Sequence, residues 1–156
     1  PAPASRVAIE EARRLIEVLD LHSHVTLVTE FLADEDSSAA LKACDLLVFP
    51  YRYTEQGASG AVRYGLACDV PVVTSDLPFF DELGASLRRI RAANVEHMTQ
   101  DLKACLLDVQ NQTPEIQAQL DVARDWVRNH SYGVLAKRLY GMVMALTRLK
   151  LRTFDA

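Results

Sequence analysis

The chain has 156 residues, of which 49% are hydrophobic, and its formal net charge at pH 7 is -4. This length and apolar content are typical of a single globular domain with one sizeable core. The acidic balance argues against a dedicated nucleic-acid binder, because such proteins concentrate Lys and Arg to neutralise phosphates.

Cysteine usage and hydropathy argue against a disulfide-rich, zinc-binding or membrane-spanning protein. Cys44, Cys68 and Cys105 are odd in number and lie far apart in apolar stretches, which is typical of buried free thiols in a reducing cytoplasm. No cluster of His and Cys has the spacing of a zinc site, so we expect no metal. No stretch approaches the roughly 18 apolar residues of a membrane-spanning helix. We therefore expect a cytoplasmic domain, and the opening PAPAS reads as a linker inside a longer parent protein.

The first part of the chain alternates helical and extended patterns. Apolar residues recur at helical spacing, then a β-branched run follows, then acidic residues precede a second helical stretch. The expected elements are a helix over 7–21 capped by Ser5, a strand over 24–29, and a helix capped by Asp34 or Asp36 that runs through Cys44.

The centre of the chain predicts a βαβ unit. Residues 45–50 form a near-continuous apolar run that ends in proline, which indicates a strand buried on both faces of a parallel sheet. A helical pattern over 59–68 and a second buried strand over 71–74 follow. Because ligands of such sheets bind at the carboxyl ends of the strands, we expect the site within 50–59 and 75–80.

The remaining pattern predicts a turn with a short helix, a weaker edge strand over 87–92, and three helices over 95–110, 114–129 and 132–151. The fold class is therefore α/β, with a Rossmann-like parallel sheet flanked by helices and further helices at the ends. Such domains usually begin with a strand, so we expect at least one strand upstream of residue 1.

The loop after the first buried strand is the candidate binding segment. Its small residues open a helix, where unpaired N–H groups and the helix dipole can hold an anion. A tight loop whose glycines only relieve backbone strain is the open alternative, and Ser59 is also a natural N-cap. The loop is neither G-x-G-x-x-G nor a Walker A motif. The candidate residues are Gln56, Gly57, Ser59, Gly60 and Ala61.

The runs CDLLVFP (44–50) and ACDVPVVTS (67–75), together with Glu55 and the small-residue helix start, resemble the C-terminal domain of GT-B retaining glycosyltransferases. The group 1, or family 4, type is the best match, and 123–140 resembles the closing helices of that family. The resemblance implies that residues 1–156 are part of a domain that binds a nucleoside-diphosphate sugar, with the N-terminal acceptor-binding domain outside this chain.

In that family two glutamates stand about eight positions apart, one near the donor sugar and one on the nucleotide ribose. The resemblance implies that Glu55 is the catalytic residue, whereas the second position falls on Arg63 or Tyr64, neither of which is a carboxylate. Arg63 is a candidate phosphate ligand or an ion-pair partner of Glu55, and a solvated or structural arginine is the alternative. Glu82 lies where the family has a loop near the donor, and a solvated turn residue is the alternative.

Two basic features have more than one interpretation. Arg88, Arg89 and Arg91 form either a patch for phosphates or membranes, or a solvated strand edge. The apolar and basic faces of the last helix suit a neighbouring domain, or peripheral contact with an anionic membrane.

Asp45 stands at the start of its strand, which argues against a phospho-acceptor role.

The reaction implied by the resemblance is transfer of a hexose from a nucleoside-diphosphate sugar to a saccharide or lipid-linked acceptor, with retained configuration, in polysaccharide or lipopolysaccharide synthesis. It implies no cofactor beyond the sugar nucleotide and no metal, and we expect this fragment to be inactive alone. A non-catalytic nucleotide- or sugar-binding module is the alternative. An epimerase of the same architecture is disfavoured, since the sequence lacks the extra acid and base residues.

Overall fold

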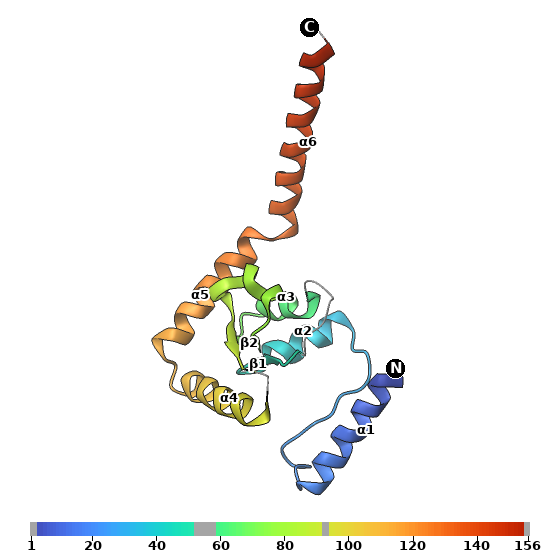
Figure 1. Cartoon of the computed structure of the whole chain (residues 1–156), viewed down its shortest axis with the longest axis vertical. Helices are drawn as coiled ribbons and strands as arrows, with labels where there is room; N and C mark the ends of the chain where they lie inside the picture. Colours follow the sequence, from blue (N-terminus) through green and yellow to red (C-terminus); the bar gives the residue numbers. More distant parts are fainter. Residues whose placement is uncertain (1–2, 52–58, 92–93, 155–156) are drawn as a thin grey trace. The chain divides into compact units, whose positions relative to one another are not determined.

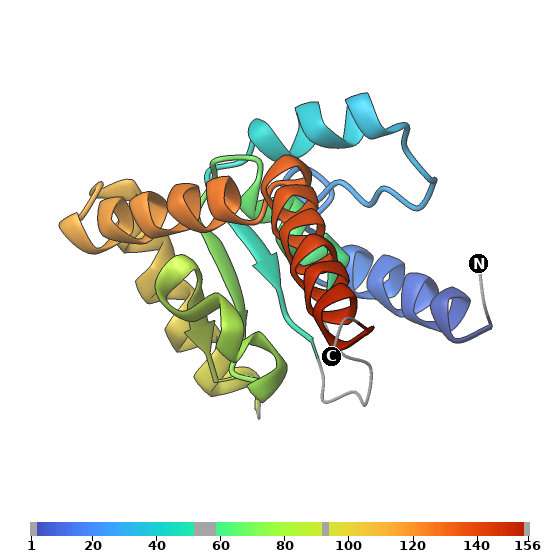
Figure 2. The same ribbon diagram turned by 90° about the horizontal axis from the view of Figure 1, so that it is seen from above.

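The computed structural model describes residues 3–51, 59–91 and 94–154, and its elements are drawn in Figure 1 and, from above, in Figure 2. The chain divides into two compact units, Pro1–Ser37 and Ser38–Ala156. Each unit is described by itself.

The first unit contains the helix α1, Pro3–Val18, and the start of α2, Asp34–Lys42. Both expected helices are confirmed, but the predicted caps are wrong. Helix α1 begins before Ser5, because proline suits a first helical turn. Asp34 and Asp36 lie inside the first turn of α2, where a carboxylate favours the positive end of the helix dipole.

The strand expected over 24–29 is wrong. The structure assigns no strand to these residues, and Val25 and Val28 are 41% and 59% exposed. A β-branched run becomes a strand only where a neighbouring strand satisfies its backbone hydrogen bonds. The described part of the first unit offers no such neighbour.

The second unit is built on a parallel sheet in the order β1-β2-β3, formed by Leu47–Phe49, Val72–Ser75 and Arg88–Ile90. The α/β class and the three central strands are therefore confirmed. The middle strand β2 is buried throughout, whereas Val48 on β1 is 38% exposed. The expectation that β1 is buried on both faces is wrong at Val48, because β1 is an edge strand among the described residues.

Helices and one 3-10 segment connect and follow the strands. They are α3 (Gly60–Leu66), η1 (Pro78–Ser86), α4 (Val95–Gln110), α5 (Pro114–Asn129) and α6 (Tyr132–Phe154). The bounds expected for α4 and α5 are confirmed, and α6 continues three residues past the expected end. Asn94 caps α4 by accepting from the His97 N–H at 2.8 Å, and proline opens α5.

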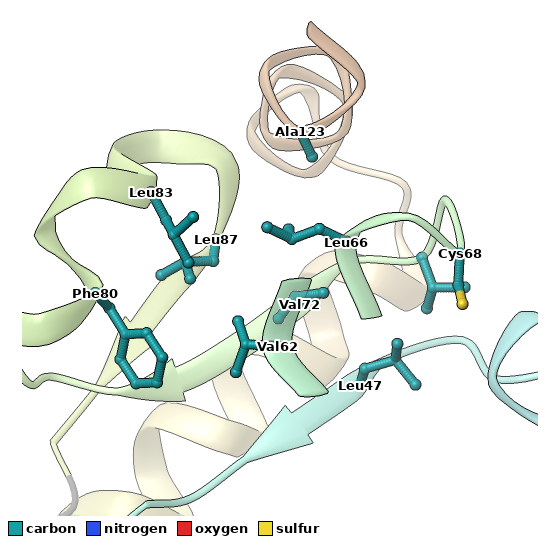
Figure 3. Close-up of a cluster of buried hydrophobic side chains, with 10 residues drawn as sticks. Leu47, Val62, Leu66, Cys68, Val72, Phe80, Leu83, Leu87 and Ala123 are labelled. Carbon is teal, nitrogen blue, oxygen red and sulfur yellow. The ribbon is translucent and has the colours of Figure 1, made fainter. Parts of the chain in front are cut away.

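Apolar side chains cover both faces of the sheet. On one face Val72 packs with Val62 and Leu66 of α3, Phe80 of η1 and other residues of the cluster in Figure 3. On the other face a smaller cluster joins β2 and β3 to α4. Successive strand residues point to opposite faces, so one strand supports both clusters, as in a doubly wound domain.

Two further contacts fix this arrangement. A Cβ on Gly65 would lie 3.1 Å from the Phe49 ring and 3.2 Å from Leu47, so glycine lets α3 approach β1 closely. Gln119 of α5 donates to the Val72 carbonyl at 2.8 Å and secures α5 to the central strand. All three thiols are free, and two are buried, whereas Cys44 is exposed, so the expectation of a buried thiol is wrong there.

Candidate functional site

The candidate site lies where β1 and β2 end. The strands are parallel, so the carboxyl ends of Leu47–Phe49 and Val72–Ser75 share one edge of the sheet. Tyr51 and Ser59 follow β1, and η1 follows β2. This edge contains several of the predicted residues. The roles predicted for Glu55, Gln56 and Gly57 stay predictions, since these residues lie outside the described residues.

Ser59 is the N-cap of α3, as the sequence predicts. Its backbone is extended, with φ -79° and ψ 116°, and its Oγ accepts from the Val62 N–H at 3.3 Å. The same oxygen is 2.7 Å from the Tyr51 hydroxyl. A serine hydroxyl can donate once and accept twice, so these two contacts leave one position unused by the described residues. Capping therefore does not prevent Ser59 from binding a ligand.

Arg63 and Glu82 come together across the edge. The Arg63 Nη1 group donates to the Ser59 carbonyl at 3.3 Å, and Nη2 pairs with Glu82 Oε1. Their side chains are 30% and 55% exposed. Three predicted residues thus form one group, which links the start of α3 to η1. We call Ser59, Arg63 and Glu82 the edge group.

The sequence suggests Glu55 as the ion-pair partner of Arg63, and it indicates Glu82 only as a residue near the donor, not as a partner of Arg63. The two residues are 19 positions apart, so no local spacing connects them. The available signal was topological: each follows one of two adjacent parallel strands, and such segments meet at the same edge.

Gly60 and Ala61 form the exposed start of α3. The helix has seven residues, so its dipole is short and most anion binding at this edge would depend on side chains. The dipole of α3 therefore contributes less to anion binding than the sequence suggests.

Tyr51 is held in place by an aromatic cluster. The sequence did not lead us to expect this cluster. The Tyr51 ring stacks on Phe49 at a centroid distance of 6.4 Å and meets Phe79 and Phe80 at 6.3 and 5.9 Å. Contacts of this kind stabilise an aromatic side chain in one orientation. The cluster therefore holds the hydroxyl that binds Ser59, and the signal for it was the Phe-Phe pair directly after Pro78.

The arginines of β3 and its end are all ion-paired, which favours a paired strand edge over a phosphate or membrane patch. Hydrogen bonds that Arg91 donates hold the pKa of the Asp101 carboxyl at about 2, and the hydrogen bonds that Arg89 donates to Asp81 and Asp76 raise the pKa of Arg89 itself. The pairs are Arg88 with Asp108, Arg89 with Asp76 and Asp81 at 3.3 and 2.7 Å, and Arg91 with Asp101 at 2.6 Å.

The described residues contain no group of three or more His, Cys, Asp and Glu side chains arranged to hold a metal ion. Within the same ranges, every helix is too short or too polar to cross a membrane.

Comparison with known proteins identifies the family. Residues 4–108, more than half of the chain, match the sequence profile of "Glycosyl transferases group 1". No curated protein matches the sequence. The fold is similar to that of sucrose-phosphate synthase from Thermosynechococcus elongatus, with a TM-score of 0.65 over 88% of this chain and 15% identity. The chain covers 34% of the length of that protein. This chain therefore belongs to the group 1 glycosyl transferases, and its α/β fold is that of the C-terminal half of a GT-B architecture.

Proposed function

We propose that this chain is the donor-binding domain of a glycosyltransferase that transfers a hexose from a nucleoside-diphosphate sugar to a saccharide or lipid-linked acceptor. Family membership supports the class of reaction. The observation that carries the site is the edge group, in which three residues selected from the sequence meet at the carboxyl edge of β1 and β2. Ligands of open α/β sheets bind at this edge.

The chemistry of the edge suits an anionic leaving group. Departure of a nucleoside diphosphate concentrates negative charge on its phosphates, and fixed donors that meet this charge lower the barrier. The Arg63 guanidinium can bind phosphate through two N–H groups at once, and the Ser59 hydroxyl can donate a further hydrogen bond when the Tyr51 hydroxyl donates to it. In this proposal the amides of Gln56 to Ala61 assist them, Glu55 orients the sugar, and neither a metal nor a cofactor is required.

The proposal places acceptor binding in a domain outside this chain, with retained configuration in the product and synthesis of polysaccharide or lipopolysaccharide in the cytoplasm. The described part of α6 exposes large apolar residues such as Leu139 and Leu146, which are 59% and 64% exposed. These support the interpretation that α6 packs against that further domain. Peripheral contact with an anionic membrane is the alternative for the same face.

A non-catalytic nucleotide- or sugar-binding module is the second candidate. One observation favours it: the position at which the resemblance leads us to expect a second carboxylate falls on Arg63 or Tyr64, and Arg63 pairs with Glu82. Such a module would bind the nucleotide sugar without turning it over, even when joined to its parent protein.

Calorimetric titration with UDP, GDP and their common sugar conjugates tests the proposal. We expect saturable binding of one nucleotide, weakened about tenfold or more by Arg63→Met because a charge-assisted phosphate contact is lost. Glu55→Ala and Gly60→Val should also weaken binding. Arg128→Met is the matched control, since Arg128 pairs with Asp125 on α5 and not at this edge. Absence of binding by folded protein, or an equal loss in the control, would contradict the proposed site.

A further inference from the structure

We propose that Glu82 is an internal competitor of the anionic ligand: its carboxylate holds Arg63 in the ligand-free chain, and a phosphate oxyanion displaces it on binding. The inference deepens the proposed function, on which it rests for the identity of the ligand. It makes Glu82 a residue that sets affinity by exchange, instead of one that contacts the donor.

The position of the ion pair supports this exchange. Arg63 belongs to α3, the helix after β1, and Glu82 belongs to η1, the 3-10 segment after β2. The ion pair therefore joins the two segments that border the proposed ligand site. The other terminal nitrogen of the guanidinium, Nη1, donates to the Ser59 carbonyl at 3.3 Å. That second contact can keep Arg63 in place while its carboxylate partner is exchanged.

The chemistry of the pair makes the exchange feasible. A guanidinium group binds carboxylate and phosphate oxygens alike, so Glu82 occupies an N–H group of Arg63 that a phosphate would use. The pair is partly exposed, and exposed ion pairs of this kind change an equilibrium by only about 1.5- to 5-fold. A diphosphate carries more negative charge than a single carboxylate and can therefore displace it.

The neighbouring residue shows why the proposal concerns Arg63. Asp81, the residue before Glu82 in η1, pairs with Arg89 at 2.7 Å, and Arg89 also contacts Asp76. Two carboxylates balance Arg89, whereas Glu82 is the one carboxylate that the described residues bring to Arg63. An incoming anion therefore gains more at Arg63.

The test is a calorimetric titration of the full chain with inorganic pyrophosphate and, separately, with UDP. We expect Glu82→Gln to tighten pyrophosphate binding about 1.5- to 5-fold, since the competitor is removed and the shape is kept. Asp81→Asn is the matched control, because it removes the same charge from the adjacent residue without releasing Arg63, and it should leave affinity nearly unchanged. In an Arg63→Met background, the effect of Glu82→Gln should vanish.

Several results overturn the inference. These are weaker or unchanged pyrophosphate binding by Glu82→Gln, an equal gain in Asp81→Asn, or no pyrophosphate binding by either the original chain or Glu82→Gln. Weaker UDP binding by folded Glu82→Gln and Glu82→Ala would instead make Glu82 a donor ligand and leave the proposed function intact. Tighter pyrophosphate binding by Glu82→Gln without any nucleotide or sugar-nucleotide binding would support the exchange and contradict the proposed function.

Discussion

Replacement of Ser59 by alanine tests how the edge group is built. The substitution removes the cap of α3, which costs about 1 kcal/mol of folding stability. It also removes the partner of the Tyr51 hydroxyl, and a lost hydrogen bond between partly buried groups costs about 0.5–1.5 kcal/mol. The two losses together should lower the free energy of unfolding by roughly 2 kcal/mol. The loss affects the whole unit, because Val62 and Leu66 connect α3 to the core.

Urea denaturation followed by circular dichroism measures this loss. Ser59→Asn should recover about half of it, since asparagine caps a helix as well as serine does. Tyr51→Phe should cost about 1 kcal/mol, and the double variant with Ser59→Ala should cost less than the sum of the two, because they remove one shared bond. A loss below about 0.5 kcal/mol for Ser59→Ala, or full additivity, would refute this account of the edge group.

Three other perturbations probe the rest of the domain. Gly65→Val should lower unfolding free energy by about 1–3 kcal/mol in urea titrations through overpacking, whereas Gly60→Ala, with open space around it, should not. The pKa of the Asp101 carboxyl, measured by NMR, should be about 2. Its ion pair with Arg91 therefore stabilises the fold above about pH 4, and this stabilisation is lost as the pH falls toward 2. An Asp101 pKa in the usual range for aspartate would contradict this. A thiol reagent should modify Cys44 first, and the two buried thiols, whose pKa values burial raises, only on unfolding; equal rates would disprove that burial.

The parts of the fold that the sequence predicts well are those with strong local signals. Apolar runs bounded by proline predict β1 and β2, and the Thr113-Pro114 pair marks the start of α5. The βαβ unit is correct because its pattern is dense and its connections are short. These same residues carry the family resemblance, so fold and family are confirmed together.

The parts that the sequence predicts poorly depend on distant partners. The 24–29 segment has the propensity of a strand, but propensity does not provide a neighbouring strand. The exposure of Cys44 depends on what packs over the end of α2, which an apolar context does not reveal. Arg63 and Glu82 lie in two segments that meet because the strands before them are neighbours in the sheet, so their ion pair is visible only in the folded chain.

Nuclear magnetic resonance on the isotopically labelled chain can map where a nucleoside-diphosphate sugar such as UDP-glucose or GDP-mannose binds. We predict that the amide chemical shifts that change on binding belong mainly to residues 59–63 and 76–82, where the carboxyl ends of β1 and β2 meet. Shifts that concentrate instead around the α4–α5 turn, at Asn111 to Thr113, or on α6, would contradict a donor site at this edge.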